Sequence, residues 1–167
     1  MSLSQLNAGY DVREDRIILR VNTTAGEEYR LFLTRRITLQ LVTFAQQQLV
    51  DLVARDHGPQ AARAIADFRQ DAAQQQTDFN VAFKAAEHYP LGLDPKLVVS
   101  IQGMLAPRPQ LKLGLKEGTA LTLSLDEGLL RSMCLLLERT VALTQWQGGV
   151  EVPAPSAPVA VPPVSMH

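Results

Sequence analysis

The sequence has little of what metal proteins, disulfide-stabilised proteins and small enzymes depend on. Cys134 is its single cysteine, so an internal disulfide is excluded. Three widely separated histidines, His57, His88 and His167, give no metal-ligand spacing, so we expect no metal and no cofactor. Cys134 precedes a run of leucines, and we interpret it as a small core side chain rather than a reactive thiol.

A recognisable catalytic site is also missing. The glycines are too scattered to form a phosphate-binding loop. His88 and Asp78 could orient a base, but an isolated histidine in a proline-rich loop is usually solvated. The acidic residues between positions 11 and 28 are more simply explained as counter-charges for neighbouring arginines. We therefore assign no catalytic residue and predict that the protein is not an enzyme.

Long apolar runs and an excess of one charge are absent as well. No uninterrupted apolar run approaches the roughly 18 residues of a membrane helix, and the first residues lack the basic flank of a signal peptide. These absences favour a cytoplasmic location without a membrane partner. The net charge of −1 gives no overall attraction to nucleic acid. With 46% apolar and 20% charged residues among 167, the composition is that of a globular domain.

What the chain does contain is a repeated pattern. Residues 16–36 and 110–125 each alternate apolar and other side chains around a short turn, which predicts two β-hairpins. A shift of 92 positions superposes them without a gap and places Gly26 on Gly118. The match continues into the helices that follow. We favour an internal duplication over the alternative that two amphipathic hairpin–helix units merely look alike.

The predicted fold is α+β, with duplicated β-β-β(-β)-α units related by pseudo-twofold symmetry. Antiparallel sheets pack with two amphipathic helices, and a connector helix joins the units. A further strand precedes each hairpin, at 5–12 and at 97–104. The repeats then cover about 5–55 and 97–146 of a single domain, residues 1–150.

Capping residues predict where the helices begin and end. The first helix should begin near Arg35 or Thr38 and end at Gly58, and Asp126 should be the N-cap of the second. The connector, residues 59–96, should start as a helix and become extended where prolines interrupt it. The expected apolar stripe of this connector helix consists of Ala61, Ile65, Phe68 and Ala72.

The end of the chain differs from the rest in composition. Trp146 ends the second helical pattern, and we expect it to pack against the body because a large aromatic side chain has much area to bury. Residues 151–167 are rich in proline and should form a disordered tail. A docking peptide is the alternative interpretation of this tail.

Two phrases of the sequence resemble those of a family of uncharacterised proteobacterial proteins. They are Glu-Glu-Tyr-Arg-Leu-Phe-Leu-Thr-Arg-Arg at 27–36 and Pro-Leu-Gly-Leu-Asp-Pro at 90–95. This resemblance spans most of the chain except the tail and implies no activity. The duplicated strands-then-helix plan is also similar to the Whirly and PUR single-stranded nucleic-acid-binding folds, whose units have four strands and a helix.

The two hairpins differ on the face that points away from the core, and this difference marks the candidate site. Arginine beside aromatic and aliphatic side chains is typical of protein interfaces and of single-strand stacking surfaces. The alternatives are that the face is solvated or that the connector helix covers it. The candidate residues in the first unit are Arg16, Ile18, Arg20, Arg30 and Phe32, followed by Arg35 and Arg36. The counterparts of the first five are Arg108, Gln110, Lys112, Thr122 and Ser124.

We predict a non-enzymatic bacterial interaction or regulatory protein that self-associates through an open sheet edge or this face. Its partner is then itself or another protein. The alternative is a single-stranded nucleic-acid-binding protein of Whirly-like or PUR-like architecture that uses Arg20, Arg30 and Phe32. Acidic residues in the same stretch nearly cancel the arginines, which lowers this alternative. They are Asp11, Glu14, Asp15, Glu27 and Glu28.

Overall fold

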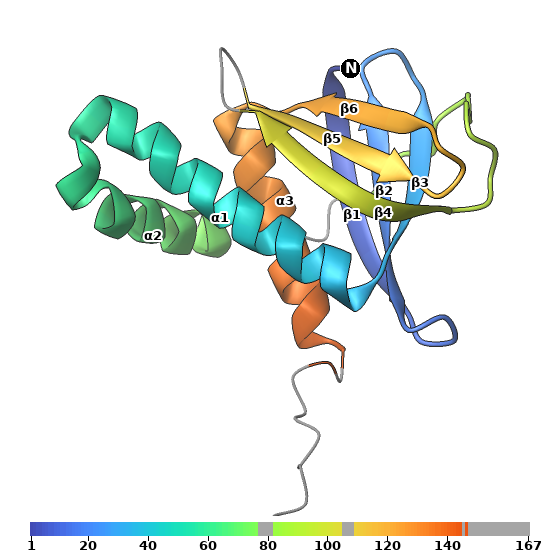
Figure 1. The fold of residues 1–167 in the computed structure, drawn as a ribbon, viewed down its shortest axis with the longest axis horizontal. Helices are drawn as coiled ribbons and strands as arrows, with labels where there is room; N and C mark the ends of the chain where they lie inside the picture. The colour runs from blue at the N-terminus through green and yellow to red at the C-terminus, as the bar shows by residue number, and fades with distance from the viewer. Residues whose placement is uncertain (77–81, 105–108, 145, 147–167) are drawn as a thin grey trace, which may run out of the picture.

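The computed structural model describes residues 1–76, 82–104, 109–144 and 146. Each unit consists of three strands and a helix, with an additional helix between the units (Figure 1). This confirms the predicted α+β fold of two strands-then-helix units. The first unit comprises β1 (Leu3–Asp11), β2 (Arg16–Thr23), β3 (Glu28–Leu33) and α1 (Arg35–His57), and α2 (Pro59–Gln76) follows it. The second comprises β4 (Lys96–Met104), β5 (Gln110–Leu115), β6 (Ala120–Ser124) and α3 (Glu127–Ala142).

The strands form one six-stranded sheet in the order β1 to β6. Strands are antiparallel within each unit, and the units join where β3 and β4 run parallel, with Phe32 opposite Leu97. The expected antiparallel sheets are therefore united into one mixed sheet. Beside the outer edges, a parallel bridge links Ser2 to Ser124, the position in β6 that corresponds to Phe32 in β3. The open sheet edge expected from the sequence is closed at this end.

The turns of the two hairpins are equivalent, as the repeat predicts. The amide of Gly26 donates to the carbonyl oxygen of Thr23 at 3.1 Å, and that of Gly118 donates to Leu115 at 3.0 Å. The backbone φ is positive at both glycines, 77° at Gly26 and 88° at Gly118, and residues other than glycine rarely adopt such a value. The shared turn fixes the same register in both hairpins.

The first strand of each unit also repeats an irregularity. A register shift interrupts β1 after Leu3 and β4 after Val98, at matching points of the pairing with the next strand. In this strand the matching positions are 95 apart rather than 92, so the chain between matching paired positions, Leu3 and Thr23 or Val98 and Leu115, is three residues shorter in the second unit. A bulge retained in both units supports a duplicated plan.

The helices begin as their caps predict. The side chain of Thr34 accepts from the amide of Ile37, and that of Asp126 accepts from the amide of Leu129. These two caps are again 92 positions apart. The first helix ends at Gly58, whose φ of 80° stops the α-helical path as expected.

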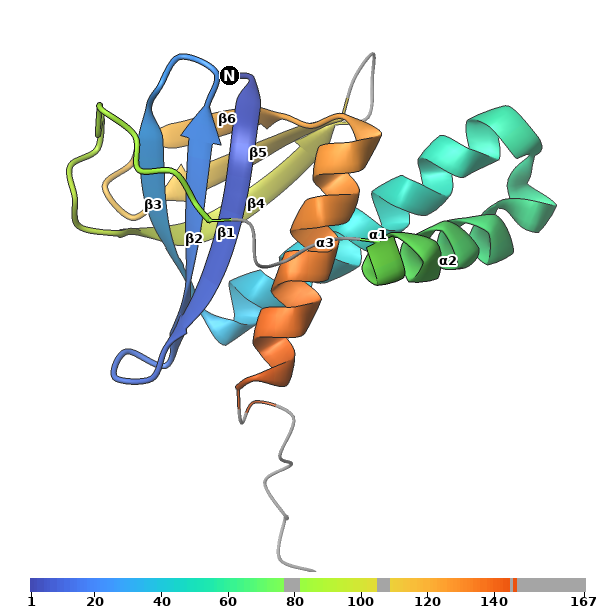
Figure 2. The ribbon, with the colours of Figure 1, turned by 180° about the vertical axis from the view of Figure 1, so that it is seen from behind.

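The core lies between the inner face of the sheet and α1 and α3. Each helix packs against the strand that opens the other unit: α1 against β4 and α3 against β1, with α1 and α3 also in contact (Figures 1 and 2). The alternating residues of the hairpins line the inside, and burying each large one contributes about 1.5 to 3 kcal/mol. Those with no exposed surface include Ile17, Leu19, Val21, Leu31, Leu33, Leu111, Leu113 and Leu123.

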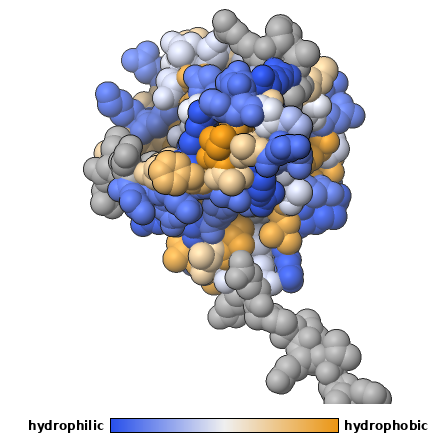
Figure 3. Space-filling model, turned by 90° about the vertical axis from the view of Figure 1, so that its left-hand side faces the viewer, coloured by the Kyte–Doolittle hydropathy of each residue, from blue (hydrophilic) through white to orange (hydrophobic). Residues whose placement is uncertain are grey.

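The connector helix α2 pairs with α1, and together they project from the sheet (Figures 1 and 2). The predicted apolar stripe was wrong at Ala61, which is exposed, and at Phe68, which is 74% exposed. Instead Ala62 and Ala66 are buried against Val53, because alanines let two helices approach closely. Figure 3 views the molecule from the end where α1 and α2 project, and on this side apolar side chains lie within a largely hydrophilic surface.

Trp146 packs on the body, as predicted. It is 6% exposed, its Nε1 donates to Asp15 Oδ1 at 2.6 Å, and its ring meets Tyr10 edge to face. Asp15 has a φ of 48° in the turn between β1 and β2. The predicted disordered tail, 151–167, lies outside the described residues. None of the helices in the described ranges combines the length and apolarity needed to cross a membrane.

Candidate functional site

Five of the seven candidate residues share the outer face of the first hairpin. Their alternation on β2 and β3 turns them away from the core, and Arg20 pairs across the strands with Arg30. The guanidinium of Arg16 lies 5.5 Å from the centre of the Phe32 ring, and Ile18 is the cross-strand partner of Phe32. The structure therefore brings Arg16, Ile18, Arg20, Arg30 and Phe32 together.

The other two candidates lie apart, in the first turn of α1. Arg35 and Arg36 are both exposed. Nη2 of Arg36 donates to the carbonyl oxygen of Val99 at 3.3 Å, so this side chain links the first unit to β4.

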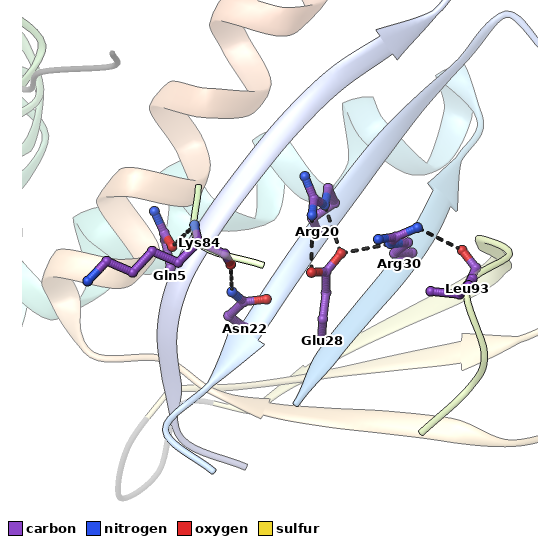
Figure 4. A network of polar contacts seen from close by, with 7 residues as sticks. All are labelled: Gln5, Arg20, Asn22, Glu28, Arg30, Lys84 and Leu93. Carbon is purple, nitrogen blue, oxygen red and sulfur yellow. Dashed lines mark hydrogen bonds and ion pairs between the residues drawn. The ribbon is translucent and has the colours of Figure 1, made fainter. Parts of the chain in front are cut away.

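A buried carboxylate holds two of the arginines. The Glu28 side chain is fully buried, and its Oε1 accepts from Nε of Arg20 at 2.8 Å and from Nε of Arg30 at 2.7 Å (Figure 4). Burial raises the pKa of Glu28, but the hydrogen bonds and charges of the two arginines outweigh it and leave the pKa below its ordinary value. Glu28 thus serves as the counter-charge that the sequence indicated.

A segment without helix, residues 82–93, lies across this face, and we call it the strap. Near its end the amide of Gly92 donates to the carbonyl oxygen of Tyr89 at 2.9 Å, which closes a turn. Gln5 donates to the carbonyl oxygen of Ala82 and accepts from the amide of Lys84, both at 3.1 Å. Asn22 Nδ2 donates to the carbonyl oxygen of Lys84 at 2.7 Å (Figure 4). Because these contacts reach the strap through its backbone, they hold it largely independently of its side chains.

Aromatic side chains of the strap stack on the two arginines that pair with Glu28. The Arg20 guanidinium lies 4.1 Å from the centre of the Phe83 ring, and that of Arg30 lies 5.1 Å from the centre of Tyr89. Arg30 also donates to the carbonyl oxygen of Leu93 at 3.2 Å (Figure 4). Cations over rings in a partly covered site contribute roughly 0.5 to 2 kcal/mol each.

The strap also adds to the edge of β3. The backbone carbonyl oxygen of His88 accepts from the amide of Glu28 at 2.8 Å, and the backbone amide of His88 donates to the carbonyl oxygen of Gly26 at 3.3 Å. These two hydrogen bonds form a parallel bridge between His88 and Glu27. An extended segment that pairs with a sheet edge in this way is β-augmentation, here within one chain.

The alternative in which the connector helix covers this face was wrong, because the extended half of the connector covers it. Sequence reasoning missed Phe83, Lys84, His88 and Tyr89. The one signal that could have found two of them is the pair of aromatic residues, Phe83 and Tyr89, in a proline-interrupted segment. Their backbone contacts leave no pattern, since every residue carries the same amide and carbonyl groups.

The equivalent face of the second unit forms an open groove of about 330 Å³, which we call the second-unit groove. Each strap-contacting residue on β1 to β3 has its counterpart in the lining of this groove, except Arg30. The matching pairs are Gln5 and Ser100, Arg20 and Lys112, Asn22 and Gly114, Gly26 and Gly118, and Glu28 and Ala120. The remaining lining residues are Val99, Gln102, Leu115 and Thr119.

The described residues hold no candidate metal cluster, and their single cysteine is buried. No three His, Cys, Asp or Glu side chains among them come together to hold a metal ion. Cys134 is buried, as predicted, and burial together with Glu138 raises the pKa of its thiol to about 12. The thiol is therefore protonated and unreactive at neutral pH.

Comparison with known protein families, curated proteins and solved structures found no match to this chain. The resemblance of the phrases at 27–36 and 90–95 to a proteobacterial family stays a prediction. Each unit has three strands rather than the four of Whirly and PUR units, and the structure shows strands-then-helix units consistent with a duplicated plan and nothing closer to those folds.

Proposed function

We propose that this protein is a non-enzymatic interaction protein of the bacterial cytoplasm that binds an extended segment of another protein in the second-unit groove. One observation carries the proposal: the first unit binds the strap across its outer face, and the second unit repeats the backbone of that face with different side chains, which line an open groove among the described residues. A repeated strand arrangement that already binds one segment needs no new backbone geometry to bind a second one.

The edge of β6 supports this proposal. In the first unit, Gly26 and Glu28 pair with the strap through backbone groups, and their counterparts are Gly118 and Ala120. Within the described part of the chain, the bridge between Glu27 and His88 has no counterpart at Thr119. Unpaired strand edges readily accept another extended segment.

The proposal is tested with a synthetic peptide of residues 82–93, labelled for fluorescence anisotropy and titrated with the full chain. We expect weak, saturable binding that Ala120→Glu abolishes, because this change places in the groove the carboxylate that fills the same position in the first unit. Ala120→Ser is the matched control and should bind as the wild type does. Binding that survives Ala120→Glu, or no binding, would contradict the proposal.

Self-association is the form of interaction expected from the sequence, and it stays a prediction. Its support at the first unit's outer face is reduced, because Glu28 and the strap occupy Arg20 and Arg30. Sedimentation velocity of the wild type and Ala120→Glu decides whether a second copy enters the groove. A wild type that is monomeric at all concentrations rules out self-association.

The single-strand alternative has lost much of its support for the same reason. Two of its three residues, Arg20 and Arg30, already bind a carboxylate and two rings of the same chain. Phosphates would have to compete with Glu28 for both of them. We expect no salt-dependent binding of a single-stranded oligonucleotide in anisotropy titrations.

A further inference from the structure

The strap site and the second-unit groove differ in their balance of charge. In the first unit Arg20 has an ion-pair partner, Glu28, on the neighbouring strand. The matching positions of the second unit are occupied by Lys112 and Ala120. Lys112 lies opposite Thr122 and Ala120 lies opposite Gly114, so no carboxylate stands at these positions. Lys112 is exposed and takes part in none of the ion pairs found among the described residues. The groove therefore presents a cation without its counter-charge.

Resting on the proposed function, we infer that the second-unit groove selects an extended acidic segment of another protein, with one carboxylate bound to Lys112. The partner then supplies the carboxylate that the second unit lacks because Ala120 replaces Glu28. Thr122 stands where the first unit has Arg30, so Lys112 is the single cation at the two matching positions, and one carboxylate balances its charge.

The strap indicates which position of the partner faces Lys112. Phe83 is the strap residue that stacks on Arg20, the counterpart of Lys112. A segment seated in the same register places its corresponding residue over Lys112. A carboxylate at that position satisfies the lysine directly.

The size of the lining residues agrees with this assignment. The groove is lined by Ser100, Gly114 and Ala120 in place of the larger Gln5, Asn22 and Glu28, and the Ser100 hydroxyl packs over Gly114. In the first unit the side chains of Gln5 and Asn22 bind the strap backbone, and the carboxylate of Glu28 binds Arg20 and Arg30. In the second unit, the side chains of the partner can enter the groove beside Lys112.

Three peptides with the sequence of residues 82–93 test the inference against the full chain. They carry Phe, Glu or Gln at the position of Phe83 and are otherwise identical. We expect the Phe83→Glu peptide to bind roughly threefold to fivefold more tightly than the Phe83→Gln peptide. This preference should shrink between about 50 and 200 mM salt, because an ion pair at an exposed lysine is screened.

Two protein variants locate the effect. Lys112→Gln should remove the preference for glutamate while leaving binding of the glutamine peptide unchanged. Lys116→Gln is the matched control, because Lys116 is an exposed lysine in the neighbouring turn that does not line the groove. Thermal melting of both variants checks that the fold is retained.

Each outcome separates the inference from the proposed function. A glutamate preference that Lys112→Gln removes and Lys116→Gln keeps supports both. Equal binding of the three peptides, still blocked by Ala120→Glu, overturns the acidic selectivity and leaves the groove as an interaction site. Binding of no peptide, or binding unaffected by Ala120→Glu, overturns both.

Discussion

In the first unit the outer face of the sheet is filled by a buried Glu28, two arginines and the strap, whereas in the second the same face is an open groove in which smaller residues replace several of these groups. The inner faces of the two units are both lined by fully buried aliphatic residues such as Leu19 and Leu111. Inward residues are constrained by a closely packed core, while outward residues can change at little cost. Divergence after a duplication is therefore expected on the outer face, where binding can differ.

Removing the ion pairs of Glu28 with Arg20 and Arg30, which we call the charge clamp, should have the largest effect on this comparison. Replacing both Arg20 and Arg30 with alanine leaves the buried carboxylate of Glu28 without a partner. We expect a loss of about 3 kcal/mol in the free energy of unfolding, measured by urea denaturation. Lys112→Ala in the second unit should cost less than about 0.5 kcal/mol. Equal losses in the two units would show that the clamp does not distinguish them.

The helix-facing side of the first strands offers a second contrast. Gly103 of β4 packs directly beneath the ring of Phe44, whereas the matching residue of β1 is Ala8. Gly103→Ala forces that ring to move and should cost about 1 to 2 kcal/mol in thermal or urea unfolding. The matched change Ala8→Gly should not produce a clash. Combining Gly103→Ala with Phe44→Leu should recover part of the loss, and a fully additive double variant would argue against this contact.

The two hairpin turns should respond alike. Gly26 and Gly118 both have a positive φ and open space around them, so an added methyl group causes backbone strain without a clash. Gly26→Ala and Gly118→Ala should each cost about 1 kcal/mol, measured side by side by urea unfolding. Costs that differ by more than about 1 kcal/mol would mean that the two turns are not equivalent.

The smallest effect is on the pH dependence of stability. Because the pKa of Glu28 is lowered in the folded state, its contribution is present above the ordinary value of 4.5 and is lost as the pH falls through the lowered pKa. Glu28→Ala, which introduces the second unit's residue, should flatten the decline of stability in this acidic range. Urea unfolding at a series of pH values measures the slope. An unchanged slope would mean that other carboxylates cause the decline.

Much of the local structure could be predicted from particular residues. The alternation around Gly26 and Gly118 indicated both hairpins, Asp126 and Gly58 marked helix ends, and Trp146 was expected on the body. These features depend on neighbours in the chain or on the area of one side chain. Period-two alternation likewise placed five of the candidate residues on one face of the sheet.

The sequence by itself therefore determined the two units, their turns and caps, and which face of each hairpin is apolar. Only the tertiary structure decided that β3 and β4 join in parallel, that Ser2 closes onto Ser124, and that the strap rather than α2 covers the arginines. These features are made largely by backbone groups far apart in the chain, and every residue type supplies the same groups. The position of Phe68 shows the same limit, because the close packing of two helices through Ala62 and Ala66 decides which face of α2 is buried.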